Sequence, residues 1–433
     1  MTPAPSDTSI PSLGPCTFHS PVHRIGGVEA PFKTDADRIL YHSHLLEHGR
    51  DFTTPSYEEA GPREQIYFDP GRTSVGIVTC GGLCPGLNDI IRGLVNRCHQ
   101  QYGITRVYGF RYGYEGLVQS YGHTPLLLKP GSVEQGHHFG GTMLGSSRGK
   151  QDIGLMVDTL EDMNIDILFV IGGDGTLRGA AEITKEIERR GLKKAIVGIP
   201  KTIDNDIRYL DKSFGFETAF DAAVQAVKCA YVEATGAVNG VGLVKLMGRD
   251  SGFIACYAAL AGSNVDFVLI PEVPFQLEGA GGLLEVLRHR LMRRGSAVIV
   301  VSEGAGQDLM HTGDETDASG NKRYGDIGQF LKEQINAFFK SRKTEVNLKY
   351  IDPSYIVRSV PANAQDNVYC SRLAQSAVHA AMAGKTGMLV GRWHGSFVHL
   401  PLELVIHGRR KVDPTQELWH SVLECTGQPA VMQ

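Results

Sequence analysis

The sequence predicts an α/β fold built on parallel β-sheets, and repeated patterns of two kinds support this. Short apolar runs of strand length, such as residues 75–79 and 167–171, are each followed by a glycine-rich turn. The second run is apolar on both faces, as expected for a buried parallel strand. Apolar residues then recur every three or four positions, which is typical of an amphipathic helix. This order predicts right-handed crossovers, with ligands bound outside the carboxyl ends of the strands.

The expected elements follow one another from residue 73 onwards. The predicted strands cover residues 75–79, 167–171, 195–199, 241–246, 267–270 and 297–301. The predicted helices cover roughly residues 87–98, 153–160, 177–187, 214–231, 252–260 and 368–383. Gly384 follows the last of these helices and is expected at its C-terminal cap.

Three stretches lack this alternation. Residues 1–70 are rich in Pro, Ser, Thr and His, and we expect an extension with one helix near residues 35–48. That extension either makes a subunit contact or is loosely held. Residues 304–321 are expected to form an exposed loop, and residues 406–433 a C-terminal tail.

Bulk composition narrows the class of protein. The 433 residues leave room for two or three domains, and a net charge of −4 gives no reason to expect a nucleic-acid partner. We find neither an apolar run of about 20 residues nor a signal peptide, so we expect a cytoplasmic protein that does not bind membranes. The eight cysteines are expected to be reduced, with Cys80 and Cys84 more readily explained as small loop residues than as a metal or redox pair.

A glycine loop follows the strand at residues 167–171. Gly172 and Gly173 allow close approach of a ligand to the backbone, and N–H groups at the start of the next helix can bind phosphate oxygens. Asp174 is then suited to hold Mg²⁺, which prefers one or two carboxylates together with phosphate oxygens. Gly175 keeps the path of the phosphates clear. The alternative is a tight turn with Asp174 as a helix N-cap.

An acidic loop follows the strand at residues 195–199. Thr202, Asp204 and Asp206 alternate, so in an extended backbone their side chains face one way. Asp204 is our candidate for the general base that accepts a proton from a hydroxyl group. Asp206 is left with two possible roles, orienting the site or contacting the metal. The alternative is that Asp and Asn simply favour turns here.

Charged side chains elsewhere suit phosphate and sugar. Lys201 and Arg148 are candidates for stabilising the transferred phosphoryl group, and Arg249 for bidentate recognition of a phosphate. Glu303 follows the strand at 297–301 and could accept hydrogen bonds from sugar hydroxyls. A further phosphate clamp is suggested by Tyr355 and Arg358, with Lys349 nearby. The alternatives are solvated arginines and surface salt bridges.

Because of these residues and their spacing, the chain resembles the 6-phosphofructokinase family from about residue 73 to 405. The matching stretches are residues 81–88, 144–149, 172–176, 200–206, 247–249 and 271–275. Residues 350–358 and the long N-terminal extension resemble the long ATP-dependent branch of plants, protists and some bacteria.

The resemblance implies two Rossmann-like α/β/α domains, with an active site in the cleft between them. The N-terminal extension would cover residues 1–70. Residues 71–213, completed by part of 357–405, would bind ATP. Residues 214–356 would bind fructose 6-phosphate, and residues 406–433 would be the tail.

The resemblance also implies roles for individual residues. Mg-ATP would be bound by Gly81, Arg148, Gly173, Asp174, Gly175 and Thr176, with Asp174 on the metal. Fructose 6-phosphate would be bound by Thr202, Ile203, Asp204, Met247, Gly248, Arg249, Glu303, Tyr355 and Arg358. Asp204 falls on the proton acceptor of the family, so the implied reaction is ATP-dependent formation of fructose 1,6-bisphosphate in glycolysis.

The phosphoryl donor depends on two residues. Pyrophosphate-using relatives typically carry Asp where this chain has Gly175, which indicates ATP. Lys201 is shared with the pyrophosphate users and favours the other donor, so a pyrophosphate-dependent enzyme is one alternative. A second alternative is a non-catalytic regulatory subunit that binds sugar phosphate, and the presence of both Asp174 and Asp204 argues against it.

One position departs from the family. Short bacterial members have an arginine seven residues before the Met of Met-Gly-Arg, and it reaches the sugar phosphate across a subunit interface. This chain has Gly240 there. The resemblance still implies an allosteric homodimer or homotetramer, with the effector and its site left open.

Overall fold

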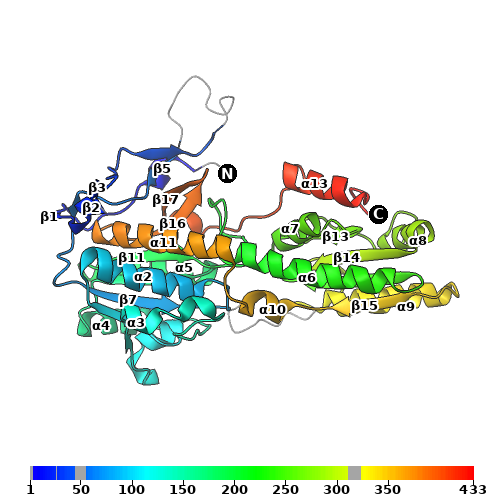
Figure 1. Cartoon of the computed structure of the whole chain (residues 1–433), viewed down its shortest axis with the longest axis horizontal. Coiled ribbons are helices and arrows are strands. Elements are labelled where there is room, and N and C mark those ends of the chain that lie inside the picture. The colour runs from blue at the N-terminus through cyan, green and yellow to red at the C-terminus, as the bar shows by residue number, and fades with distance from the viewer. Residues whose placement is uncertain (1–2, 26, 44–54, 311–322) are drawn as a thin grey trace. The chain divides into compact units, whose positions relative to one another are not determined.

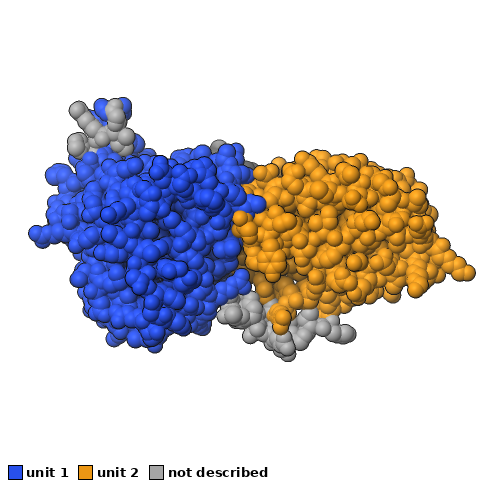
Figure 2. Space-filling model, turned by 60° about the horizontal axis from the view of Figure 1, so that its bottom comes forward, with its two compact units in different colours: residues 1–202, 207–215, 360–408 blue, residues 203–206, 216–359, 409–433 orange. Residues whose placement is uncertain are grey.

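The predicted strands assemble into two sheets that belong to different parts of the chain. The computed structural model describes residues 3–25, 27–43, 55–310 and 323–433. Unit 1 comprises residues 1–202, 207–215 and 360–408, and unit 2 comprises residues 203–206, 216–359 and 409–433. Figure 2 colours them blue and orange. Among the described residues, no helix has an apolar stretch long enough to cross a membrane.

Unit 1 contains a nine-stranded sheet in the order β4-β5-β17-β16-β11-β10-β7-β8-β9. Its five central strands are parallel: β16 (Met388–Trp393), β11 (Ala195–Pro200), β10 (Ile167–Gly172), β7 (Ser74–Thr79) and β8 (Arg106–Gly109). The outer strands are antiparallel: β4 (Arg38–Leu40), β5 (Ser56–Glu59), β17 (Ser396–Pro401) and β9 (Leu126–Leu127). The prediction of parallel strands is therefore confirmed for the centre and wrong for the edges.

A tight hairpin explains the change of direction between β16 and β17. The two residues that join these strands, His394 and Gly395, both have left-handed backbone conformations, with φ of 46° and 82°. A two-residue loop of this kind can connect only antiparallel strands.

The helices of unit 1 pack on its sheet (Figure 1). They are α2 (Leu87–Tyr102), α3 (Pro130–Val133), α4 (Ile153–Asp162), α5 (Asp174–Arg189), α11 (Ala364–Met382) and α12 (Leu402–Val405). Helices α2 and α11 pack against each other, and α4 packs against α5. Gly384 follows α11 with a left-handed φ of 72°, as expected at a helix C-terminus.

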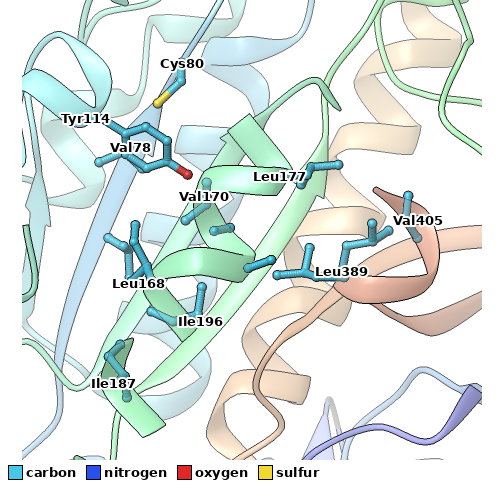
Figure 3. Close-up of a cluster of buried hydrophobic side chains, with 14 of the residues drawn as sticks. Val78, Cys80, Tyr114, Leu168, Val170, Leu177, Ile187, Ile196, Leu389 and Val405 are labelled. Atoms are coloured by element: carbon cyan, nitrogen blue, oxygen red, sulfur yellow. The ribbon is translucent and has the colours of Figure 1, made fainter. Parts of the chain in front are cut away.

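The core on the α4–α5 side of the sheet supports the strands that carry the glycine loops. Figure 3 shows Leu168, Val170 and Ile196 of the central strands packed with Leu177 and Ile187 of α5. All five side chains are buried. This packing fixes the carboxyl end of β10, where residues 172–176 begin.

Short elements complete unit 1. They are the strand pairs β1 (Phe18–His19) with β6 (Gln65–Ile66) and β2 (Arg24–Ile25) with β3 (Val28–Glu29). The 3₁₀ turns are η1 (Pro5–Thr8), η2 (Pro21–His23), η3 (Gly113–Leu117), η4 (Gln119–Tyr121) and η5 (Gly136–His138).

The N-terminal residues form part of the large sheet. Strand β5 pairs with β17, and β4 pairs with β5. The helix expected near residues 35–48 is wrong for the part that the structure describes, because Arg38–Leu40 is strand β4; residues 44–48 lie outside the described residues. The partner of β4 lies 18 positions later in the chain, so local periodicity did not reveal this pairing.

Unit 2 has a four-stranded sheet that is parallel throughout, in the order β13-β14-β12-β15. The strands are β12 (Gly240–Leu246), β13 (Phe267–Leu269), β14 (Ser296–Ser302) and β15 (Asn347–Ile351). The helices are α6 (Phe216–Thr235), α7 (Phe253–Gly262), α8 (Leu283–Arg294), α9 (Ile327–Ser341), α10 (Ser354–Ser359) and α13 (Glu417–Thr426), with a 3₁₀ turn η6 (Gln307–Leu309). Most of the loop expected at residues 304–321 lies outside the described residues.

Most of the segment that was expected to form a C-terminal tail, residues 409–433, belongs to unit 2. Helix α13 packs against α7 and buries Trp419. The amide side chain of Gln428 accepts from the N–H of Val268 at 2.6 Å and donates to its carbonyl at 3.2 Å. Met432 is buried in the core. The tail was expected because this segment follows the last match to the family, and its partners lie about 150 residues earlier in the chain.

Candidate active site

In unit 1, hydrogen bonds join three loops at the carboxyl ends of β7 and β10. The N–H of Cys80 donates to the carbonyl of Ile171 at 2.9 Å, which links the two strand ends. The N–H of Gly81 donates to the carbonyl of Ser147 at 3.0 Å, and the hydroxyl of Ser146 donates to the carbonyl of Gly81 at 2.6 Å. The turns after β7 and β10 and the loop at residues 144–149 therefore lie together, as their predicted shared role requires.

Two glycines of the second turn serve different purposes. A Cβ at Gly172 would lie 2.3 Å from the Cβ of Thr176, so the packing itself excludes a side chain. A Cβ at Gly175 would meet no atom within 4 Å. Gly175 is the second residue of α5, and its φ is not in the left-handed range that favours glycine. Since the fold does not require glycine there, the space beside it is available to a ligand.

The two predicted cations of unit 1 meet at the first glycine turn. Lys201 is buried, and its Nζ donates to the carbonyl of Gly82 at 2.7 Å. A Cβ at Gly82 would lie 3.2 Å from a terminal nitrogen of Arg148. Thr202 then ends this part of unit 1, and the buried Ile203 begins the acidic segment of unit 2.

Asp174 is the first residue of α5, and the N-cap is Gly173. The alternative that Asp174 itself caps the helix is therefore wrong. Its carboxylate forms an ion pair with Arg178 at 3.0 Å, one helical turn later. A carboxylate in the first turn is favoured by the helix dipole and lies beside the N–H groups that could bind phosphate. Thr176 is buried, and its carbonyl accepts from the hydroxyl of Tyr114 at 2.7 Å.

Unit 2 places Arg249 and Glu303 side by side. They follow the neighbouring parallel strands β12 and β14, and the N–H of Glu303 donates to the carbonyl of Leu246 at 2.9 Å. Met247 leads into Gly248, whose φ of 127° allows the turn before Arg249. Burial raises the pKa of the Glu303 carboxyl, and the nearby positive charge of Arg249 opposes this shift.

The acidic loop is not extended. Asn205 has a left-handed φ of 55°, so the expectation based on simple alternation is wrong in its backbone geometry. Asp204 and Asp206 are nevertheless both partly exposed as whole residues, on either side of the buried Asn205, although one carboxylate oxygen of Asp204 is buried. The hydroxyl of Ser251 donates to the carbonyl of Asp204 at 2.9 Å, and the N–H of Arg410 donates to the carbonyl of Asp206 at 2.7 Å.

The surroundings of Asp204 favour its protonated form. Burial raises the pKa of its carboxyl well above the usual range, and the negative charges of Asp206 and Glu303 raise it further. Arg409 lowers the pKa but does not cancel the increase. A raised pKa suits a carboxylate that must accept a proton near neutral pH.

Helix α10 carries the predicted phosphate clamp. The guanidinium group of Arg358 lies 4.8 Å from the ring centre of Tyr355, which is 75% exposed. The positive charge of Arg358 lowers the pKa of Glu303, which indicates that these two side chains lie near each other in unit 2. Lys349 is exposed on β15, and its place in the site stays a prediction. The lysine whose charge also acts on Glu303 is Lys245 of β12.

Sequence reasoning missed Arg178, Lys245 and Arg409. Arg178 could have been found from its position four residues after Asp174. Lys245 lies within an otherwise apolar strand, so the strand pattern did not mark it as a site residue. The position of Arg409 depends on the return of the C-terminal segment to unit 2, which local patterns do not encode.

Gly240 cannot carry the arginine that stands there in short bacterial relatives. It is the first residue of β12, and a Cβ there would lie 1.9 Å from the carbonyl oxygen of Ala234 in α6. Any side chain would force the strand and the helix apart. The cross-subunit contact is therefore not made from this position.

Comparison with known proteins supports one family assignment. Residues 74–381 match the family model described as Phosphofructokinase. The chain is 48% identical over 444 residues to an ATP-dependent 6-phosphofructokinase of Amycolatopsis methanolica, covering 99% of this chain and 96% of the relative. It is 49% identical over 379 residues to ATP-dependent 6-phosphofructokinase 7 of Arabidopsis thaliana, covering 87% and 78%.

A solved structure supports the fold alone. The crystal structure of a pyrophosphate-dependent phosphofructokinase from Marinobacter aquaeolei aligns with a TM-score of 0.65 at 20% identity, covering 81% of this chain and 91% of the other. The two units, each with a β-sheet and helices packed on it, define an α/β class of protein, and the chain belongs to the phosphofructokinase family.

Proposed function

We propose that this protein transfers a phosphoryl group from ATP to the 1-hydroxyl of D-fructose 6-phosphate, which gives fructose 1,6-bisphosphate in glycolysis. The observation that carries the proposal is 48% identity over 99% of the chain to a relative named for this ATP-dependent activity. The presence of both Asp174 and Asp204 supports catalysis rather than a purely regulatory role.

The donor part of the reaction is assigned to unit 1. The N–H groups at the start of α5 and the open space beside Gly175 fit the phosphates of ATP. Asp174 fits a magnesium site because Mg²⁺ needs few protein carboxylates when phosphate oxygens supply other ligands. The ion would offset the charge of the phosphates. Lys201 and Arg148 would stabilise the negative charge of the transferred group.

The acceptor part is assigned to unit 2. Arg249 and Arg358 would bind the 6-phosphate, and Glu303 would accept hydrogen bonds from sugar hydroxyls. Asp204 would take the proton of the 1-hydroxyl as that oxygen attacks phosphorus. Its raised pKa makes it a stronger base than an exposed aspartate.

The choice of donor rests on Gly175. Because a Cβ at Gly175 would meet no atom of another residue within 4 Å beyond its own helix turn, we expect Gly175→Asp to be compatible with the fold and to place a carboxylate where we assign the phosphates. We expect this variant to fold normally and to lose most of its kcat/KM with ATP. Purified wild-type protein and the variant should be assayed with Mg²⁺ and fructose 6-phosphate, using ATP or pyrophosphate as donor.

Each result of the donor assay has a clear meaning. ATP use by the wild type, with impaired ATP use by Gly175→Asp, supports the proposal. Efficient pyrophosphate use by the wild type would replace it with the pyrophosphate-dependent reaction that Lys201 favours. Unchanged ATP kinetics in the variant would separate Gly175 from donor choice.

A further inference from the structure

The C-terminal segment of unit 2 places an arginine beside the acidic loop. The Nε of Arg409 lies 3.8 Å from a carboxylate oxygen of Asp206, and a terminal nitrogen of Arg409 also pairs with the carboxylate of Asp250. The N–H of the next residue, Arg410, donates to the carbonyl of Asp206. The segment therefore holds the acidic loop through both a side chain and the backbone.

The two carboxylates that Arg409 joins come from different elements. Asp206 ends the segment that carries Asp204, and Asp250 follows Arg249 in the turn after β12. Arg409 is 26% exposed, and the side chains of Asp206 and Asp250 are 12% and 29% exposed. Partial burial strengthens such charge-assisted contacts relative to exposed ion pairs.

We propose that Arg409 is a positioning residue for the phosphoryl transfer proposed above. Arg409 ties the acidic loop to the turn after β12 and so holds the carboxylate of Asp204 toward the acceptor hydroxyl. The inference rests on the proposed function. It concerns the placement of the base rather than a direct contact with substrate.

The geometry favours this role over phosphate binding. A planar guanidinium group can engage two carboxylates at once, and that of Arg409 is already shared between Asp206 and Asp250. Loss of this link leaves the sequence of the loop intact but frees Asp204 to move. A displacement of about 1 Å at a reacting group can reduce turnover by up to about 100-fold.

Arg190 offers a matched control in unit 1. It is 21% exposed and pairs with Asp158, Glu161 and Glu186. It follows the C-terminal end of α5, whereas Asp174 begins that helix. Arg190→Ala therefore removes a similarly exposed, shared arginine without touching the assigned site.

The test measures kcat, KM and thermal unfolding midpoints for full-length wild type, Arg409→Ala, Arg409→Lys and Arg190→Ala with ATP and fructose 6-phosphate. We expect Arg409→Ala to lose roughly 10- to 100-fold in kcat, with KM for fructose 6-phosphate changed by less than about threefold. Arg409→Lys should recover part of the kcat, because lysine keeps the charge but cannot hold both carboxylates equally well. Arg190→Ala should keep its kcat even if its midpoint falls.

Other outcomes overturn the assignment. A wild-type kcat in Arg409→Ala removes the role, and a rise in KM at constant kcat makes Arg409 a substrate contact instead. If Arg409→Ala does not fold, full activity in Arg409→Lys would show that the geometry of the arginine is not needed. An inactive wild type would refute the proposed function itself, which is a separate result.

Discussion

We expect Asp204 to lower the free energy of unfolding even though it supports the proposed phosphoryl transfer. Its pKa is raised in the folded protein, chiefly by burial and then by Asp206 and Glu303. The unfolded chain therefore loses this proton at a lower pH than the folded protein does. Stability should fall as pH rises above the ordinary aspartate pKa of about 3.9 and continue to fall until the higher folded pKa is reached, so this cost is present at neutral pH.

Asp204→Asn should consequently raise the thermal unfolding midpoint at pH 7 while cutting kcat by about 100-fold or more. The gain in midpoint should shrink as the pH is lowered below about 4, where the wild-type carboxyl becomes protonated in the unfolded as well as the folded state. Differential scanning calorimetry and steady-state kinetics at several pH values measure both effects.

Asp413→Asn is the control for this prediction. Hydrogen bonds from Thr415 lower the pKa of Asp413, so its ionised form favours the folded state and neutralisation should give no gain in midpoint. A lower midpoint for Asp204→Asn at pH 7, or turnover near that of the wild type, would contradict the role assigned to Asp204.

The sequence revealed residues whose partners are close in the chain. Asp174 and Gly175 follow a strand and begin a helix, so their position at a helix start was predictable from local pattern. The φ of Asn205 was not predictable, because the loop takes its shape from contacts with Ser251 and Arg410. Arg409 was missed because it lies about 200 residues after the loop that it contacts.

A buried cluster of charged side chains attaches the N-terminal strands β4 and β5 to the rest of unit 1. Glu58 of β5 pairs with Arg63 at 2.8 Å, with Lys385 at 3.1 Å and with His399 of β17 at 2.8 Å. Burial opposes ionisation of Glu58, but the hydrogen bonds and charges of His399 and Lys385 outweigh it and lower its pKa to about 2. The carboxylate therefore contributes stability at pH values above its unfolded pKa of about 4.3, and this contribution is lost as pH falls toward 2.

Glu58→Gln should destabilise this attachment at pH 7 by up to roughly 3 kcal/mol, because it removes the buried carboxylate of Arg63 and Lys385 and leaves them only the exposed carboxylate of Asp35. Trp393 can report the change, since its ring stacks on Tyr41 of the N-terminal part at 5.3 Å. The chain has two tryptophans, so Trp419→Phe leaves Trp393 as the single reporter. Urea unfolding followed by tryptophan fluorescence at pH 7 and at lower pH measures the loss.

Glu59→Gln is the matched control in the neighbouring position. Its partner is Lys33 at 2.9 Å, and these two side chains are 25% and 30% exposed, so the cost should be about 1 kcal/mol or less. Equal effects of the two substitutions would show that the cluster at Glu58 does not hold the strand. The difference between wild type and Glu58→Gln should shrink as the pH falls below about 4.

Elements were predictable where strand and helix alternate locally. The central strands β7, β10 and β11 were found because both of their faces are apolar. The antiparallel strands β4 and β5 were missed because they are short and because β5, the partner of β4, pairs with β17, which lies more than 300 residues later. Their stability comes from this distant pairing and from the buried cluster, neither of which leaves a local pattern.

The chain passes repeatedly between its two units. It crosses after residues 202, 206, 215, 359 and 408, so neither unit is a continuous segment. The residues around Asp174 that we propose for the donor lie in unit 1, whereas Asp204, Arg249 and Arg358, which we propose for the acceptor, lie in unit 2. Each substrate should therefore stabilise a different unit, because a ligand that binds only the folded form stabilises what it contacts.

Hydrogen exchange measured by mass spectrometry tests this division. Mg-ATP should slow exchange at residues 79–86, 144–149 and 172–178, and fructose 6-phosphate at residues 246–251, 303–304 and 354–359. At ligand concentrations near 100 times Kd, exchange that requires opening of the bound region should slow by up to about 100-fold. Asp174→Ala should remove the ATP effect and keep the sugar-phosphate effect, and Arg358→Ala should do the reverse. Protection by fructose 6-phosphate around Asp174 alone would contradict the assignment of the acceptor site to unit 2.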